Sequence, residues 1–337
     1  MTTISAGFEL PFELEAHEPA EARGLRRDQV RLMVGNRITG EVSHHVFADL
    51  PSVLHPGDVL VVNTSATIPA AIDVIGDGLV LHVSTELPTG EWVVELRHGL
   101  SPFRHGGPGP LALSGGAIAT LVRPYTRGRL WVARFSVDDV PGYLMQFGRP
   151  IRYSYVDREW PLSTYSSVFG IEPGSAEMPS ASRPFTPQLV TQLVASGVAF
   201  APITLHTGVA SPEAHEKPYP ERFRVPADTA RLVNSARAAG RRIIAVGTTA
   251  VRALESAATP SGVVEAAAGW TSLVVTPDSG VRVTDGLITG FHEPRASHLD
   301  MLSAIAGPAL LDACYSAALR EGYLWHEFGD INLLLRR

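Results

Sequence analysis

The strongest chemical signal in the sequence is a β-branched stretch that ends in Gly247-Thr248-Thr249 and continues as a helical pattern. Gly247 permits a tight turn, because glycine has no Cβ to restrict the backbone. The free amide groups at the start of the helix, together with the two threonine hydroxyls, could bind a carboxylate or another anion. Arg252 could hold such a carboxylate through two parallel hydrogen bonds. The alternative is that Thr248 only caps the helix and Arg252 is solvated, and the spacing leaves both interpretations open.

Two histidines follow predicted strands. His206 comes after the strand expected at 198–205, and His292 after the one expected at 286–291. Ligands of α/β proteins usually bind at the carboxyl ends of strands. We expect the two strands to be neighbours, which favours a place for both histidines in a site. A structural role is the alternative, because a single histidine is more often structural than catalytic.

One acidic residue is a candidate general base. Glu221 lies in a proline-rich segment, 212–226, which also contains His215 and Glu216 and which we predict to be a loop. Loops often carry functional residues. A carboxylate in a loop can accept a proton efficiently if burial raises its pKa. The alternative is a solvated carboxylate without a catalytic role.

These residues need a sheet that brings strand ends together. Short apolar runs with β-branched residues predict strands at 59–62, 198–205, 242–246, 286–291 and 331–335. Helical patterns lie at 187–195, 227–239, 248–258, 297–305 and 308–321, and Thr186 and Pro187 open the first of these. The alternation indicates a mixed α/β main domain, formed by residues 1–69 and 150–337.

A different pattern occupies residues 70–149. Short strands alternate with glycine and proline turns at 79–84, 91–97, 117–123 and 129–135. Closely spaced short strands are typical of a small barrel or sandwich. We predict that this segment is an inserted small β-barrel domain.

Composition excludes several classes of protein. The chain has 337 residues, 45% of them hydrophobic, which favours two folded domains over disorder. Its single cysteine, Cys314, excludes an internal disulfide and suits a reducing cytoplasm. We expect no signal peptide, no membrane span and no metal site, because none of the corresponding sequence patterns occurs. Phosphate-binding loop, dinucleotide-binding and nucleophile-elbow motifs do not occur either.

The charge distribution gives little sign of a nucleic-acid partner. The formal net charge is −6, whereas dedicated nucleic-acid binders usually carry an excess of basic residues. One dense basic stretch contains Arg23, Arg26, Arg27 and Arg31. We interpret this stretch as a solvated surface.

Taken together, the motifs resemble the S-adenosylmethionine:tRNA ribosyltransferase-isomerases of queuosine biosynthesis. The resemblance covers nearly the whole chain. Its most specific blocks are 246–255 (VGTTAVRALE), 284–292 (TDGLITGFH), 301–304 (MLSA) and 328–330 (FGD), and N-terminal blocks lie at 8–11 and 54–63.

The resemblance implies a chemistry. Such enzymes transfer and isomerise the ribosyl moiety of S-adenosylmethionine, a co-substrate, onto a 7-aminomethyl-7-deazaguanine base in tRNA, and they need no other cofactor. The match makes Gly247, Thr248, Thr249 and Arg252 candidates for holding the donor. By the same match, Asn63 lies at the donor-binding sheet edge with His206 and His292, and Glu221 is the candidate base. We expect a cytoplasmic monomer.

Several blocks depart from the family pattern. The family has a Pro-Thr-Ala-Gly-Leu-His-Phe-Thr run where this chain reads PSASRPFT at 179–186. Two family arginines are replaced by Ala66 and Ala71, and a histidine by Tyr219. These changes remove potential phosphate contacts. They leave an alternative open, in which a divergent relative binds S-adenosylmethionine or a related nucleoside and acts on a small molecule, or has no catalytic activity.

Overall fold

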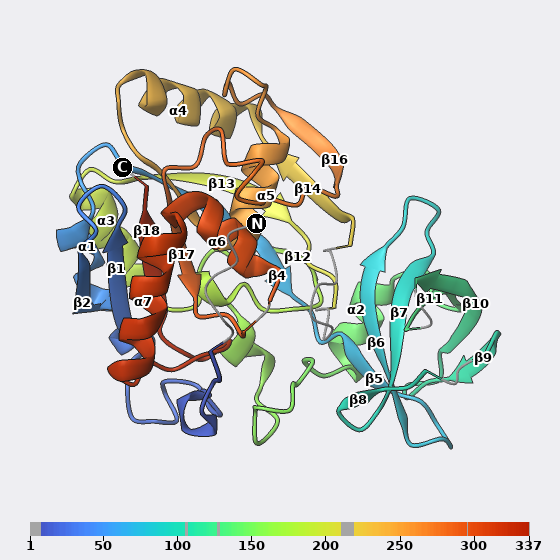
Figure 1. The fold of residues 1–337 in the computed structure, drawn as a ribbon. Helices are drawn as coiled ribbons and strands as arrows, with labels where there is room; N and C mark the ends of the chain where they lie inside the picture. The colour runs from blue at the N-terminus through green and yellow to red at the C-terminus, as the bar shows by residue number, and fades with distance from the viewer. Residues whose placement is uncertain (1–7, 105–106, 127–128, 210–218, 295, 337) are drawn as a thin grey trace.

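The two largest elements of the fold are two separate sheets that lie side by side (Figure 1). The computed structural model describes residues 8–104, 107–126, 129–209, 219–294 and 296–336. Within these residues the larger sheet has nine strands, in the order β16-β14-β13-β3-β15-β17-β18-β1-β2. The mixed α/β architecture that the sequence predicts is therefore present.

Four parallel strands form the centre of the larger sheet. They are β13 (Ala199–Leu205), β3 (Val59–Asn63), β15 (Ile243–Val246) and β17 (Gly286–Gly290). All four strand predictions are confirmed within a residue or two. Because the four strands run in the same direction, their carboxyl ends meet at one edge of the sheet. That edge carries Gly247 and the segments that follow β3, β13 and β17.

The outer strands of this sheet include several that the sequence analysis missed. On one side lie β14 (Glu221–Val225) and β16 (Ala267–Thr271), and on the other β18 (Ile331–Leu335), β1 (Arg31–Asn36) and β2 (Val42–Val46). Only β18 was predicted. The prediction of a loop at 221–225 is wrong, because Glu221 begins a strand that pairs with both β13 and β16.

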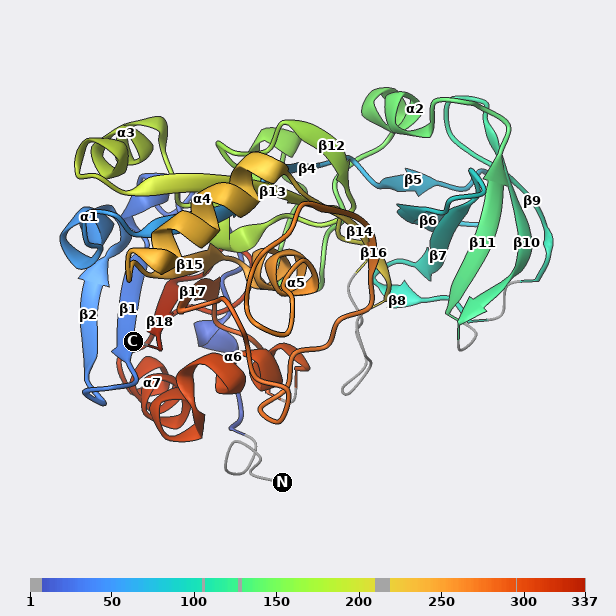
Figure 2. The same cartoon turned by 90° about the horizontal axis from the view of Figure 1, so that it is seen from above.

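Helices cover both faces of the larger sheet, as the alternation of apolar side chains in β3 requires. Val59 and Val61 pack on the side of α4 (Ala227–Ala238), α5 (Thr248–Ser256), α6 (His298–Ala306) and α7 (Pro308–Arg320). Leu60 and Val62 pack on the side of α1 (Leu50–Val53) and α3 (Pro187–Ala195). Figure 2 shows the sheet between these two layers.

The helix predictions are confirmed, with ends that shift by one or two residues. Thr186 caps α3 as expected, because its hydroxyl accepts a hydrogen bond from the Leu189 amide. Short 3-10 helices, η1 to η5, lie in the connections at Phe12–Leu14, Arg27–Gln29, Phe47–Asp49, Leu162–Tyr165 and Ser180–Ser182. Cys314 is buried on α7, as predicted.

The smaller sheet is antiparallel throughout and has its own core. Its strands are β5 (Ala71–Asp73), β6 (Leu79–Glu86), β7 (Trp92–His98), β8 (Ser101–Pro102), β9 (Gly109–Ala112), β10 (Ile118–Thr126) and β11 (Leu130–Phe135). The order is β5-β6-β7-β11-β10-β9, and an isolated bridge joins Val74, after β5, to Leu113, after β9. Helix α2 (Val140–Phe147) follows, and β12 (Glu172–Ser175) pairs with β4 (Ser65–Thr67) where the two sheets meet.

No single helix in the described parts of the chain is long and apolar enough to cross a membrane. Helices α6 and α7 together reach the required length and composition, but they are bent by 115° at Gly307.

Candidate functional site

A cavity of about 800 Å³ lies at the carboxyl edge of the parallel strands. One part of its wall comes from the main sheet, at 246–249 and 289–294, and from α5 through Arg252. The smaller sheet contributes Ser84, Thr85, Arg97, Tyr125 and Leu130. The volume is in the range of sites for small ligands and cofactors. The cavity therefore lies between the two sheets, as expected for a ligand site of an α/β protein.

Gly247 makes the turn from β15 into α5. Its φ angle is 91°, a conformation that other residues adopt only with strain, so the predicted need for glycine is confirmed. Gly247 is also the residue before the helix, and Thr248 is its first residue. No side chain caps α5, so the alternative role of Thr248 as a capping residue is wrong. Both Thr248 and Thr249 line the cavity at the positive end of the helix dipole.

Asn63 supports this turn without lining the cavity. It is almost fully buried at the end of β3. Its side-chain nitrogen donates to the Leu205 carbonyl (2.8 Å) and to the Thr249 hydroxyl (3.3 Å). Its side-chain oxygen accepts hydrogen bonds from the Leu205 and Ser65 amides. Asn63 thus ties β3, β13 and the start of α5 together, so its contact with the site is indirect.

Arg252 is buried and has hydrogen-bond partners at all three of its side-chain nitrogens, so the interpretation of Arg252 as a solvated residue is wrong. Its guanidinium forms an ion pair with Glu221. It also donates hydrogen bonds to the carbonyl oxygens of Leu273 (3.0 Å), Thr271 (3.3 Å) and Tyr219 (3.4 Å). Because these partners already occupy the guanidinium, the structure gives Arg252 no free donor pair for a ligand carboxylate. Its position instead allows it to orient the Glu221 carboxylate through the ion pair.

Glu221 lies at the cavity wall as the first residue of β14, and its side chain is only 13% exposed. The alternative of a solvated loop carboxylate is therefore wrong. Burial raises the pKa of the Glu221 carboxyl group, while the Arg252 guanidinium and the Gly208 amide oppose this rise by stabilising the charged form. A carboxylate with a raised pKa is a stronger base than a solvated one, which is the property that a general base needs.

His292 lines the cavity, and a second histidine that the sequence analysis left out lies against it. The rings of His292 and His298 are stacked, with centroids 4.5 Å apart. His292 Nε2 is 3.0 Å from the Thr289 hydroxyl, and its amide donates to the Tyr315 hydroxyl. Desolvation lowers the pKa of both histidines, so both are neutral near pH 7. The two histidines are six residues apart, and His292 lies outside α6, so no helical spacing in the sequence linked them.

His206 does not join His292, and the expectation that they follow neighbouring strands is wrong. Strands β3 and β15 lie between β13 and β17. His206 is buried, with Nδ1 2.8 Å from the Ser65 hydroxyl. It lines a separate depression of about 330 Å³ with Arg222 and Trp270. Desolvation lowers the pKa of His206 to about 4, so this histidine is a neutral, hydrogen-bonded residue outside the main cavity.

One further part of the cavity wall was not anticipated. Tyr153, Tyr155, His326 and Glu327 line the cavity from connections far apart in the sequence. In the sequence, only Phe328, Gly329 and Asp330 of this segment belong to a block that resembles the family. The adjacent histidine and glutamate shortly before Gly329 were the feature of the sequence that could have indicated this part of the wall.

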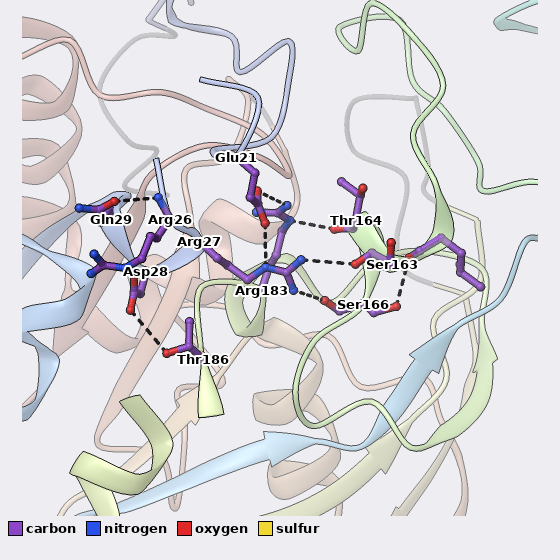
Figure 3. Close-up of polar contacts among 11 residues, drawn as sticks. Glu21, Arg26, Arg27, Asp28, Gln29, Ser163, Thr164, Ser166, Arg183 and Thr186 are labelled. Atoms are coloured by element: carbon purple, nitrogen blue, oxygen red, sulfur yellow. Dashed lines mark hydrogen bonds and ion pairs between the residues drawn. The ribbon is translucent and has the colours of Figure 1, made fainter. Parts of the chain in front are cut away.

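The interpretation of the dense basic stretch as a solvated surface holds for Arg26, whose side chain is 67% exposed, but not for the other three arginines, which are partly buried. Figure 3 shows the contacts of Arg26 and Arg27. Arg27 pairs with Glu21 (3.1 Å) and donates to the carbonyl oxygens of Ser163 and Ser166. Arg183 donates to Glu21 (2.8 Å) and to the Thr164 carbonyl. In the same stretch, Arg26 pairs with Asp28, Arg23 donates to the Phe328 carbonyl, and Arg31 lies over the Tyr323 ring.

These contacts connect the N-terminal stretch to η4 and η5. Residues 179–181, at η5, form part of the cavity wall, and Ala181 lies 3.6 Å from the position that a Cβ on Gly247 would take. The arginines therefore support one wall of the cavity. Of the other sequence candidates, His215 and Glu216 lie outside the described residues. No group of three or more histidine, cysteine or acidic side chains in the described ranges could hold a metal ion.

Comparisons with known proteins agree on one family. The family model described as "Queuosine biosynthesis protein" matches residues 5–334. The S-adenosylmethionine:tRNA ribosyltransferase-isomerase of Heliobacterium modesticaldum is 37% identical, over 97% of this chain and 98% of that protein. The protein of the same name from Rubrobacter xylanophilus is 37% identical, over 99% and 98%. The crystal structure of S-adenosylmethionine tRNA ribosyltransferase from Thermotoga maritima aligns with a TM-score of 0.56 at 29% identity, over 98% of this chain and 99% of that one.

Proposed function

The chain belongs to the queuosine biosynthesis protein family, and on that premise we propose that its cavity is the site of a ribosyl transfer and isomerisation. The donor is S-adenosylmethionine, and the acceptor is the aminomethyl group of a 7-aminomethyl-7-deazaguanine base in tRNA. The observation that carries the proposal is the meeting of the Thr248–Thr249 helix start and the buried Glu221–Arg252 pair in one cavity.

Thr248 and Thr249 bind the amino-acid end of the donor. The first amide groups of a helix have no acceptor within the helix and lie at its positive end. The methionine carboxylate of S-adenosylmethionine is the anion that suits this position. Asn63 holds the Thr249 hydroxyl in place, so its role is positioning. We assign no direct contact with the donor to Arg252, because its guanidinium is already paired with Glu221.

Glu221 is the general base. The sulfonium of the donor acidifies the neighbouring C5′ hydrogens, so a carboxylate with a raised pKa can remove one of these protons. The electron pair left on C5′ forms a C4′=C5′ double bond as the bond from C4′ to the ring oxygen breaks. That oxygen then forms a carbonyl with C1′, and adenine leaves with the electrons of its bond to C1′ and takes up a proton. The neutral ring pair of His292 and His298 lines the same cavity and helps to exclude water from the reacting atoms. His206 has no role in this scheme, because it lies outside the cavity.

We also propose two domains, one formed by residues 1–69 and 150–337 and the other by residues 70–149. The separate hydrophobic cores of the two sheets support this division. The bridge between Val74 and Leu113 links the first and last strands of the smaller sheet, which supports its closure into a small barrel. The proposed reaction needs no cofactor besides the co-substrate. We further propose that the protein is a monomer and that it acts in the cytoplasm, where its proposed tRNA substrate occurs.

The test is adenine release from S-adenosylmethionine in the presence of substrate tRNA. Glu221→Gln removes the base but keeps the shape of the side chain, and we expect it to lower kcat by about 100-fold or more. The matched control is Glu265→Gln, a change at an exposed carboxylate away from the cavity, which should leave the rate unchanged. An unchanged rate in Glu221→Gln would remove Glu221 from the mechanism. Nucleoside binding without any adenine release from the wild type would instead support the small-molecule or non-catalytic alternative.

A further inference from the structure

Glu327 is the least satisfied polar side chain of the cavity wall. Its Oε1 atom is inaccessible to water and has no hydrogen-bond partner among the described residues. No ion pair of Glu327 occurs in the described part of the chain, although the side chain lines the cavity. A buried carboxyl group without a partner costs free energy. Such a group is expected where a ligand supplies the missing partner.

The backbone next to Glu327 is strained. His326 has a φ angle of 71°, and it is the one described residue other than glycine with a positive φ. Residues in this conformation cost about 1–3 kcal/mol and cluster at ligand sites. Gly329 follows closely, and a Cβ there would lie 2.3 Å from the Leu324 carbonyl oxygen. The tight geometry of this segment holds Glu327 at the cavity wall.

Aromatic rings form a row beside this carboxyl group. The rings of Tyr155 and His326 are stacked with centroids 3.9 Å apart and planes within 8°. The ring of Tyr153 continues the row, with centroids 5.9 Å from Tyr155 and planes within 22°. All three side chains line the cavity. Planar nucleobases stack on such rings, with stacking energies that tolerate any base.

We propose that Tyr153, Tyr155, His326 and Glu327 form a purine subsite, in which the carboxyl group of Glu327 reads the hydrogen-bonding edge of adenine. This inference rests on the proposed function and deepens it, because it assigns the adenine of the donor to a part of the cavity wall other than the helix start that binds the methionine carboxylate. Glu327 is then a specificity-determining residue for the donor.

The protonation state of Glu327 decides which purine it can read. A neutral carboxyl group has one donor and one acceptor, which match a ring nitrogen and the amino group of adenine. An ionised carboxylate has acceptors only, and it would match the two adjacent donors of a guanine-type base instead. Burial raises the pKa of Glu327 to about 8, and Arg183 opposes this rise. The carboxyl group is therefore mostly protonated at pH 7, which favours adenine.

Other titratable groups surround this wall and must be separated from Glu327 in a pH experiment. Tyr155 and Tyr165 have raised pKa values through burial, with a contribution from the charge of Glu327. His326 lies 3.5 Å from Glu15 and 3.7 Å from Glu293, and burial lowers its pKa. These groups change little between pH 7 and 9, because the tyrosines titrate above this range and His326 below it.

The experiment measures binding of 5′-methylthioadenosine, a nucleoside that stays neutral across this range. The wild-type dissociation constant should be constant below pH 7.5 and should rise toward a limit of about tenfold per pH unit well above pH 8. Glu327→Gln keeps one donor and one acceptor and cannot ionise, and an amide of this kind pairs well with adenine. We expect this variant to bind within about threefold of the wild type at pH 7 and to show no rise up to pH 9.5.

Two further variants complete the test. Glu327→Ala removes both hydrogen bonds and should weaken binding at pH 7 by about 10- to 100-fold. Glu265→Gln changes an exposed carboxylate that does not line the cavity, and it should keep the wild-type affinity and pH profile. The circular dichroism spectrum of each variant confirms that it is folded.

Loss of affinity in Glu327→Gln equal to that in Glu327→Ala would overturn the inference, and so would wild-type affinity that rises with pH. Either result would mean that the ionised form acts or that the base binds elsewhere. Adenine release with wild-type kinetics in Glu327→Ala would be consistent with the proposed function and would contradict only the proposed purine subsite. Conversely, the predicted pH profile without adenine release from any form of the protein would support the subsite and reject the reaction.

Discussion

Two glutamates in the wall of one cavity are both largely buried but have different partners. Glu221 has an arginine and a backbone amide within contact, and Arg252 is itself held by three carbonyl oxygens. Glu327 has no hydrogen bond within the described residues, and only the more distant charge of Arg183 offsets its burial. Burial raises the pKa of both carboxyl groups, so the difference between them comes from the groups that contact each one.

This difference assigns different chemistry to the two parts of the wall. Beside Glu221 an arginine stabilises the charged form while desolvation raises the pKa of the carboxyl group, and a carboxylate with a raised pKa suits a base. A buried carboxyl group without a close partner keeps its proton at neutral pH, which suits a hydrogen-bond donor. Environments that separate the proton affinities of two carboxyl groups are a common way for one site to hold an acid and a base.

Removal of Arg252 should have the largest effect on stability, because it would leave the buried Glu221 carboxylate without its ion-pair partner. Arg252→Leu leaves Glu221 buried with little compensation, and we expect a loss of about 3–5 kcal/mol in the free energy of unfolding at pH 7. Urea denaturation measures this loss. The combined Glu221→Leu and Arg252→Leu variant should recover much of it, because it leaves no charge behind.

The control for this prediction is Arg231→Leu. Arg231 pairs with Asp228 on the surface, where the two side chains are 74% and 85% exposed. Such a pair contributes about 0–1 kcal/mol, so its loss should be small. An equally small loss in Arg252→Leu would show that the Glu221–Arg252 pair is not an essential part of the wall.

Replacement of Glu327 should have a smaller effect of opposite sign. The pKa of Glu327 is about 8 in the folded protein, against 4.5 for a free side chain. Between these values the folded state holds a proton that the unfolded state releases, so stability falls as pH rises from 4.5 through 8 and is then constant. Glu327→Gln abolishes this loss and should stabilise the protein above pH 8 by on the order of 2–4 kcal/mol.

The measurement is urea denaturation of both proteins at pH 4.5 and pH 8.5. The difference in unfolding free energy between variant and wild type should be near zero at pH 4.5 and should favour the variant at pH 8.5. A variant that is less stable than the wild type at pH 8.5 would mean that Glu327 is charged and has a favourable partner.

Loss of the aromatic row should have the smallest effect. Tyr155→Leu removes the stacking with His326, which is worth about 0.5–1.5 kcal/mol beyond the buried area. Tyr155→Phe keeps the ring and should stay within about 0.5 kcal/mol of the wild type. Thermal denaturation followed by circular dichroism compares the two. Equal destabilisation by both changes would show that the hydroxyl of Tyr155, rather than its ring, supports this wall.

Local features of the fold were predictable from short stretches of sequence. The strand, glycine and helix at 243–256 occur where the pattern predicts them, because the apolar run, the flexible glycine and the helical residues act on their immediate neighbours. The cap at Thr186 followed from the same kind of local signal. Glu221 was placed in a loop because of the flanking prolines, and its strand forms only because β13 and β16 pair with it.

By itself the sequence determined which segments form strands and helices, and which polar residues follow the strand ends, because hydrophobic period and turn chemistry act over a few residues. The order of strands in the sheet is a tertiary property, and it left His206 outside the cavity. The stacking of His298 on His292 also needed the folded chain, which sets the start of α6 against the segment after β17. The partner of Arg252 and the isolation of Glu327 were also decided by the tertiary structure. The charge of a buried group depends on what chain folding places within a few ångströms of it, and those neighbours come from distant parts of the sequence.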